Sequence, residues 1–320
     1  MTRAAALPER ARAIVRGDRA ALARAISDVE NGAPAAEPIL RALYARTRGV
    51  PVVGLAGPLG VGKSSLVNAL VGLLRTAGKT VGVVAVDPSS PFSGGSVLGD
   101  RIRLDRPADD EGVFFRSMAS RGAAGGIAAT SREVVRLLDA AGFDVILVET
   151  VGSGQVDIAI RDVATTRVVV LVPHLGDEVQ TLKAGLFEIA DVFCVNKSDL
   201  PGADHAERDL AELAALGPAP DGWRARIVRT STVTPVGIDR LWAAIAAHEE
   251  FLDSSGTRAA AERRRLAREI VDRASDRLAH DLTERIERDP ALRRLVDRVV
   301  ARSLDPRSAA ARLLAARSRR

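Results

Sequence analysis

From about residue 50 onwards, short apolar runs alternate with longer segments of mixed polarity. Apolar runs rich in β-branched residues predict buried strands, and apolar positions three or four residues apart predict helices. The predicted strands are residues 50–56, 81–87, 112–116, 145–150, 167–173, 192–196 and 226–230. The predicted helices are residues 63–76, 131–141, 178–187, 206–216 and 237–251. This alternation predicts an α/β fold with a mostly parallel sheet and helices on both faces.

Helical patterns flank this alternating region and give the expected domain limits. Residues 1–48 predict an N-terminal helical arm, residues 49–252 the α/β domain, and residues 253–320 a C-terminal helical arm after the Ser254-Ser255-Gly256 linker. Two Asp-Pro pairs, at 289–290 and 305–306, predict helix starts with proline in the first turn. Because short helices with one apolar stripe must bury it, we expect the C-terminal arm to form a homodimer.

The composition narrows the class of protein. Apolar residues make up 47% of the 320 residues and aromatic residues only 3%, so the core must consist of Val, Leu, Ile and Ala. The single cysteine and four scattered histidines exclude a disulfide framework and a cysteine-based zinc site, which fits a cytoplasmic protein. No apolar run approaches the roughly 20 residues of a membrane span, so we expect no membrane association.

The net charge of +5 is concentrated near the C-terminus, where residues 258–320 carry 18 arginines and 10 acidic residues. Such an excess is compatible with nucleic-acid binding or with a solvated helical surface. The mixture of signs and the lack of interleaved aromatic residues favour the second interpretation, so we expect no nucleic-acid partner.

Residues 57–64 fit the phosphate-loop pattern GxxxxGK[ST], between a predicted strand and a predicted helix. Backbone N–H groups of such a loop form an anion cradle, Lys63 is expected to reach the β- and γ-phosphates, and Ser64 to ligate Mg²⁺. A glycine-rich turn without a ligand is the weaker interpretation. The predicted phosphate-binding residues are Gly57, Pro58, Leu59, Gly60, Val61, Gly62, Lys63, Ser64 and Ser65.

Carboxylates at the ends of two predicted strands suggest a metal site. Asp87 ends one strand, and a loop rich in Pro, Gly and Ser separates it from Asp100. This loop is either a switch that brings Asp87 and Asp100 to Mg²⁺ and the attacking water, or an ordinary surface loop. Glu149 lies at the tip of the strand 145–150, as a Walker B carboxylate would, and the Gly152 N–H follows where it can sense a γ-phosphate.

Residues 196–199, Asn-Lys-Ser-Asp, follow another apolar strand and fit NKxD. The Asp199 carboxylate is suited to accept hydrogen bonds from guanine N1–H and the 2-amino group, neither of which adenine offers. We expect Asn196 to bond to the base edge and the Lys197 stem to lie on its face. The segment Thr230-Ser231-Thr232, after the last strand, is expected to make a backbone contact to guanine O6.

A helix-opening segment between these motifs contains Asp177, Gln180 and Lys183. Acidic residues here suit a helix N-terminus, which is the default interpretation. The chain has only four lysines, two of them in the nucleotide motifs, so a role for Lys183 with a switch carboxylate or a partner is the alternative.

The chain resembles the MeaB/ArgK-type P-loop GTPases of the SIMIBI class, which chaperone adenosylcobalamin-dependent acyl-CoA mutases such as methylmalonyl-CoA mutase. The resemblance covers nearly the whole chain and rests on segments 57–65, 86–101, 114–122, 149–155, 175–185, 196–199 and 304–314. The sequence departs from the family pattern at Ala123-Ala124, where His-Leu is usual, and at Val156-Asp157.

The resemblance implies Mg²⁺-dependent hydrolysis of GTP to GDP and phosphate, with a catalytic set of Lys63, Asp87, Asp100 and Glu149 and metal ligation by Ser64, Asp87, Asp100 and Glu149. It makes Asp177, Gln180 and Lys183 a switch that reports nucleotide state to the mutase. It also implies a homodimer through the C-terminal helices, and a role in gating cofactor delivery and protecting or reactivating the mutase. We expect this chain to bind no cobalamin directly.

Three alternatives remain open at this point. A nickel-delivering metallochaperone GTPase is disfavoured by the lack of His/Cys-rich ligand sets. A kinase for a transport-system binding protein would transfer phosphate to protein rather than to water. A non-catalytic GTP-binding scaffold would show no single-turnover hydrolysis.

Overall fold

The computed structural model describes residues 7–87, 110–119, 124–150, 160–173, 186–216 and 222–315. The chain divides into two compact units, Met1–Arg258 and Ala259–Arg320, and each is described by itself. The predicted Pro-, Gly- and Ser-rich loop after Asp87 lies outside the described residues, as does most of the predicted helix 178–187.

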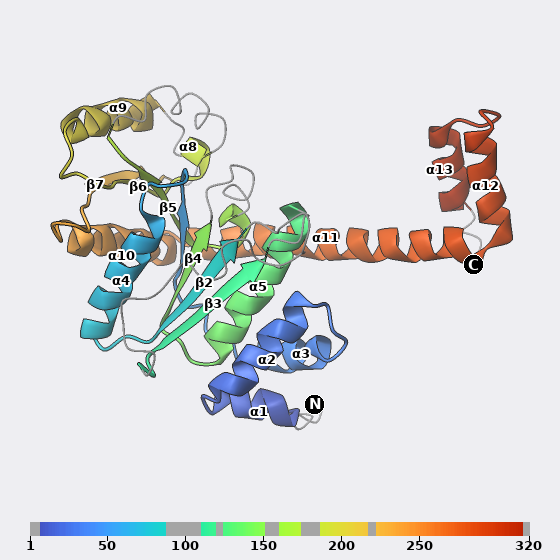
Figure 1. Ribbon diagram of the computed structural model, residues 1–320, viewed down its shortest axis with the longest axis horizontal. Coiled ribbons are helices and arrows are strands. Elements are labelled where there is room, and N and C mark those ends of the chain that lie inside the picture. Colours follow the sequence, from blue (N-terminus) through green and yellow to red (C-terminus); the bar gives the residue numbers. More distant parts are fainter. Residues whose placement is uncertain are drawn as a thin grey trace. The chain divides into compact units, whose positions relative to one another are not determined.

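The first unit is built on a seven-stranded sheet with the order β3-β2-β4-β1-β5-β6-β7 (Figure 1). Its strands are β1 Val52–Ala56, β2 Val81–Asp87, β3 Val113–Ala119, β4 Val145–Thr150, β5 Thr166–Leu171, β6 Val192–Val195 and β7 Arg226–Arg229. Each neighbouring pair is parallel, which confirms the predicted α/β class. All seven predicted strands are present.

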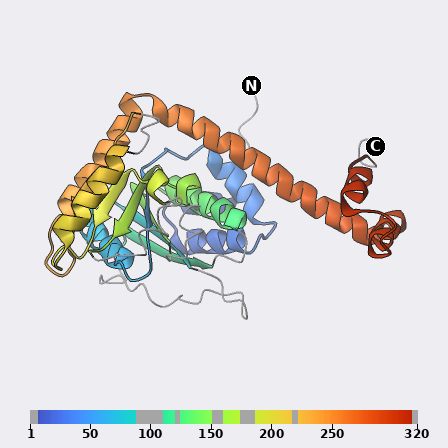
Figure 2. The ribbon, with the colours of Figure 1, turned by 90° about the horizontal axis from the view of Figure 1, so that it is seen from above.

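Both faces of this sheet are covered, because alternate side chains of each strand enter two separate cores. Helices α4 (Lys63–Thr76) and α10 (Ile238–Ser254) form one core with Leu55 and Leu147. Helices α5 (Ala124–Ala140) and α9 (Ala203–Leu216), with the short α8 (Leu186–Ile189) and η1 (Ile160–Asp162), pack on the opposite face with Ile146 and Val148. Figure 2 shows α4 and α5 on opposite sides of the sheet.

The three N-terminal helices are α1 (Glu9–Val15), α2 (Arg19–Glu30) and α3 (Ala36–Tyr44). They share the α5 core of the first unit, since Ile14, Ile26 and Leu43 are at most 2% exposed within the same cluster. Helix α2 ends at Glu30, where Asn31 is the C-cap and Gly32 follows.

Element boundaries differ from the prediction where the sequence lacks a periodic apolar signal. Helix α5 begins at Ala124, although the sequence predicts a start at residue 131. Alanine and glycine dominate residues 123–129, and they carry no large side chains that would mark a helical face. Strand β3 continues to Ala119, three residues beyond the predicted end.

The second unit contains most of α11 (Thr257–Arg288), α12 (Pro290–Val300) and α13 (Pro306–Ala315). The predicted Asp-Pro starts are confirmed: Asp289 accepts a hydrogen bond from the Ala291 N–H at 2.8 Å, and Asp305 from the Ser308 N–H at 2.9 Å. Several apolar side chains of this unit are exposed, including Ile270 at 68% and Val300 at 77%.

None of the helices in the described ranges has both the length and the apolar character that crossing a membrane would need.

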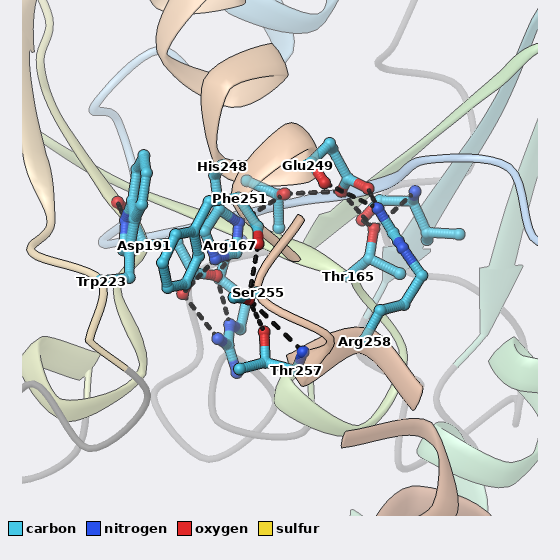
Figure 3. Close-up of polar contacts among 12 residues, drawn as sticks. Thr165, Arg167, Asp191, Trp223, His248, Glu249, Phe251, Ser255, Thr257 and Arg258 are labelled. Atoms are coloured by element: carbon cyan, nitrogen blue, oxygen red, sulfur yellow. Dashed lines mark hydrogen bonds and ion pairs between the residues drawn. The ribbon is translucent and has the colours of Figure 1, made fainter. Parts of the chain in front are cut away.

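A buried polar cluster lies where α10 passes the amino ends of β5 and β6 (Figure 3). Glu249 accepts hydrogen bonds from the Thr166 hydroxyl at 2.6 Å and from Arg258 Nη2 at 2.8 Å. His248 Nδ1 lies 2.8 Å from the same hydroxyl, and its Nε2 lies 3.4 Å from Asp191 Oδ1. Buried charges are costly unless paired, so these contacts hold α10 and the first turn of α11 on the sheet.

This cluster makes stability depend on pH through His248, which is 2% exposed. Burial lowers the pKa of His248 below its ordinary value, against the opposing effect of Asp191. The unfolded chain therefore takes up this proton more readily, and stability falls as the pH drops below about 6.5.

We expect the melting temperature to fall less between pH 7.5 and 5.5 in His248→Asn than in the wild type, as measured by thermal unfolding. The control is His205→Asn, a change at an exposed histidine, which should leave the fall in melting temperature as in the wild type. An equal fall in melting temperature for wild type and His248→Asn would contradict the prediction.

Candidate nucleotide-binding site

The sequence motifs meet at the edge of the sheet where the parallel strands end. Strands β1 and β4 are neighbours in register, with Leu55 opposite Glu149, so the loop after β1 lies beside the tip of β4. Strand β5 borders β1 on the other side, with Ala56 opposite Val169, and β6 follows. Open parallel sheets bind ligands at this edge.

The path of the loop 57–64 depends on two glycines. Gly57 has φ +144°, and a Cβ there would lie 2.2 Å from the Val170 carbonyl oxygen of β5. Gly62 has φ +92°, and its Cβ would lie 2.5 Å from Asn196 Nδ2. The loop therefore lies directly against β5 and the segment after β6. Any side chain at either glycine would force the β5 backbone or the Asn196 amide to move.

Lys63 opens helix α4 and is only 6% exposed. Its ammonium group donates hydrogen bonds to the carbonyl oxygens of Gly57 at 2.5 Å and Pro58 at 2.8 Å. The positive charge therefore lies inside the curve of the loop, at the N-terminus of a helix, where an anion is favoured.

Ser64 and Glu149 come from α4 and β4 and meet directly. The Ser64 hydroxyl donates to Glu149 Oε1 at 2.5 Å, and Glu149 is 6% exposed. A hydroxyl and a carboxylate are hard oxygen donors, and Mg²⁺ in proteins is typically held by one or two carboxylates with phosphate oxygens and water. These two residues therefore fit a Mg²⁺ ion that also binds a nucleotide phosphate.

The NKxD segment forms a turn that is fastened to β7. The Ser198 N–H donates to the Thr230 carbonyl oxygen at 3.0 Å, and the Ser231 hydroxyl donates to the exposed Asp199 carboxylate. Ser231 itself is 1% exposed and pairs its backbone with Val236. The Asp199 carboxylate is thus oriented by a buried hydroxyl.

Two side chains tie this segment to the phosphate loop. Lys197, at a positive φ of 54°, donates from Nζ to the Gly60 carbonyl oxygen at 2.8 Å. Asn196 is 1% exposed and donates from Nδ2 to the Val61 carbonyl oxygen at 2.8 Å. The Asn196 amide thus joins the two motifs, and the base contact that the sequence predicts for Asn196 stays a prediction.

The other predicted residues divide between described and undescribed positions. Leu59 is 71% exposed at the loop tip, and Ser65, in the first turn of α4, is exposed. Thr232 is half-buried after β7, and Asp87 ends β2, the neighbour of β4, although its side chain is not described. Five predicted residues lie outside the described ranges: Asp100, Gly152, Asp177, Gln180 and Lys183.

Comparisons with known proteins agree with this geometry. A family model described as "Methylmalonyl Co-A mutase-associated GTPase MeaB" matches residues 22–287. A Pyrococcus abyssi protein, provisionally named a GTPase, is 45% identical over 302 residues and covers 93% of each chain. GTPase ArgK of Escherichia coli is 36% identical over 266 residues, 80% of each chain.

Two further comparisons cover a mammalian relative and a solved structure. A mouse protein named methylmalonic aciduria type A homolog, mitochondrial, is 36% identical over 265 residues, 77% of this chain and 64% of its own. The crystal structure of a protein named LAO/AO transport system kinase superimposes with a TM-score of 0.72 at 26% identity, over 98% of both chains.

Proposed function

This chain belongs to the MeaB family of methylmalonyl-CoA mutase-associated GTPases, and from that premise we propose that its GTP hydrolysis serves an adenosylcobalamin-dependent acyl-CoA mutase. The client would be methylmalonyl-CoA mutase or a close relative. The chain would gate delivery of the cofactor and protect or reactivate the mutase, without binding cobalamin itself. The family match over residues 22–287, which spans the whole nucleotide site, is the observation that carries this proposal.

In the proposed pocket, Lys63 and the loop N–H groups bind the β- and γ-phosphates and stabilise the charge that develops during transfer to water. Ser64 and Glu149 would hold Mg²⁺, and Asp87 and Asp100 would complete the metal and water positions. Bound Mg²⁺ neutralises charge on the phosphate oxygens. Asp199, oriented by Ser231, selects guanine through its N1–H and 2-amino donors.

Further parts of the proposal concern the switch and the assembly. Gly152 would sense the γ-phosphate, and Asp177, Gln180 and Lys183 would report nucleotide state to the mutase. The helical region 253–320 would form a homodimer, which the exposed Ile270 and Val300 support because exposed apolar side chains on neighbouring helices are covered by a partner in a stable assembly.

The mutase role is tested by following purified methylmalonyl-CoA mutase during turnover, with and without this chain. We expect the mutase to lose activity more slowly when the chain and GTP are both present, and to gain nothing from the chain with GDP alone. A GTP-hydrolysing chain that leaves the decay of mutase activity unchanged would exclude methylmalonyl-CoA mutase as the client; the same assay with related acyl-CoA mutases then tests the rest of the class.

A second candidate is a protein kinase of a transport system, which the name of the superimposed crystal structure, LAO/AO transport system kinase, favours. GTP labelled at the γ-phosphate separates the two reactions. Label released as inorganic phosphate supports the GTPase assignment, whereas label retained on a protein supports the kinase.

A further inference from the structure

A short chain of buried polar side chains lies behind the proposed pocket. The Cys194 sulfur of β6 lies 3.1 Å from the Thr230 hydroxyl, which follows β7. The Thr230 hydroxyl lies 3.0 Å from Asn196 Oδ1, and Asn196 Nδ2 lies 2.8 Å from the Val61 carbonyl oxygen. Cys194 and Thr230 are fully buried and Asn196 is 1% exposed.

Elementary hydrogen-bond chemistry fixes the direction of these bonds. The Val61 carbonyl can only accept, so Asn196 must turn its NH₂ group toward the loop and its Oδ1 toward Thr230. Oδ1 also only accepts, so the single Thr230 hydroxyl proton is donated to it. The Cys194 thiol can then donate to a lone pair of the Thr230 oxygen.

The state of the thiol agrees with this direction. Burial raises the pKa of Cys194 to about 12, so at neutral pH the sulfur keeps its proton and can act as a donor. The chain of bonds therefore runs in one sense, from Cys194 through Thr230 and Asn196 to Val61 in the phosphate loop.

The Asn196 amide has little freedom apart from these bonds. A Cβ at Gly62 would lie only 2.5 Å from Nδ2, so the amide is packed directly against the loop. A flipped amide would set Oδ1 against the Val61 carbonyl oxygen and leave two buried groups without suitable partners, which is costly.

We propose that Thr230 and Cys194 are positioning residues: they hold the Asn196 amide so that the guanine-reading segment stays fastened to the phosphate loop. Their side chains are fully buried, so we expect neither side chain to touch the nucleotide. Their effect is on how long the assembled pocket retains GDP or GTP. This inference rests on the proposed nucleotide pocket and extends it to residues behind the pocket wall.

Two pairs of variants test the hydroxyl and the thiol. Thr230→Val removes the hydroxyl at nearly constant volume and leaves Asn196 Oδ1 without its donor. We expect dissociation of a fluorescent GDP analogue to become roughly tenfold faster. Thr230→Ser keeps the hydroxyl and should release the analogue at close to the wild-type rate. Cys194→Ala should accelerate release by a smaller factor, about twofold to threefold. Cys194→Ser should release the analogue at close to the wild-type rate, because the serine hydroxyl can also donate.

The control must separate positioning from general loss of stability. Val228 lies on β7 directly opposite Cys194 and in the same core, and its hydrocarbon side chain cannot join the bonded chain. Val228→Ala should lower the melting temperature without changing the GDP dissociation rate. An unchanged GDP dissociation rate in Thr230→Val would overturn the proposal. So would a Val228→Ala protein that releases GDP as fast as Thr230→Val, because faster release would then follow from lost stability alone.

The preference for guanine over hypoxanthine provides a second readout, which can be measured even if Thr230→Val folds poorly. IDP lacks the 2-amino group that Asp199 reads, so the ratio of GDP to IDP affinity should stay unchanged in Thr230→Ser and Cys194→Ala even where release is faster. A changed ratio would contradict a role limited to positioning. If the wild-type protein retains no GDP, the proposed pocket itself is wrong. If the wild type retains GDP but the variants release it at the wild-type rate, only the positioning role is wrong.

Discussion

Replacing Lys63 with alanine reduces GTP hydrolysis by a factor of about 100 to 1,000, because the variant loses the cation that stabilises charge on the transferred phosphoryl group. The buried Lys63 ammonium lies within the loop, bonded to the Gly57 and Pro58 carbonyl oxygens, so its charge is fixed where the phosphates are expected. Single-turnover hydrolysis at saturating GTP and Mg²⁺ measures the effect.

The control for Lys63→Ala is the same change at Lys79, an exposed lysine beyond the end of α4. Lys79→Ala should hydrolyse GTP at the wild-type rate. Thermal unfolding of both variants checks that the change at the buried position has not simply unfolded the domain. A folded Lys63→Ala protein with activity within about threefold of wild type would show that the loop does not bind the phosphates as proposed.

Asp199→Asn weakens GDP binding by about a hundredfold or more while it strengthens binding of xanthosine diphosphate. In the proposed pocket the carboxylate accepts hydrogen bonds from guanine N1–H and the 2-amino group, whereas an amide would present an N–H donor where the guanine donor points. Xanthine has an oxygen at that position and therefore pairs with the amide. Equilibrium titration of both nucleotides measures the exchange of preference.

Asp204→Asn makes the same chemical change on the surface of α9, where Asp204 pairs with Arg229. This control should bind GDP as the wild type does and should not gain xanthosine diphosphate. Equal losses of both nucleotides in Asp199→Asn would mean that Asp199 supports the turn without reading the base.

Local sequence patterns predict the elements and motifs well, because each depends on neighbours in the chain. Helix α4 begins at Lys63 and ends at Thr76 as predicted, since the glycine loop and the apolar spacing mark both ends. The predicted start of α5 is seven residues late, because its first turns consist mainly of Ala and Gly.

Contacts between distant segments cannot be predicted in the same way. The bonds from Asn196 to Val61 and from Lys197 to Gly60 exist because β5 and β6 follow β1 in the sheet, and no local pattern encodes that order. Cys194 lies in an apolar run, and its sequence context resembles that of any core residue. The buried hydrogen bond from Thr166 to Glu249 depends likewise on where α10 crosses the sheet.

The central claim is that one pocket at the carboxyl edge of the sheet combines a phosphate loop, a magnesium-binding pair and a guanine-reading aspartate. A crystal structure with Mg²⁺ and a slowly hydrolysed GTP analogue tests it most directly. We expect Lys63 Nζ within hydrogen-bond distance of the β- or γ-phosphate, Ser64 and Glu149 around the metal, and both Asp199 oxygens facing guanine. A nucleotide bound elsewhere, or a base pointing away from Asp199, would contradict the account.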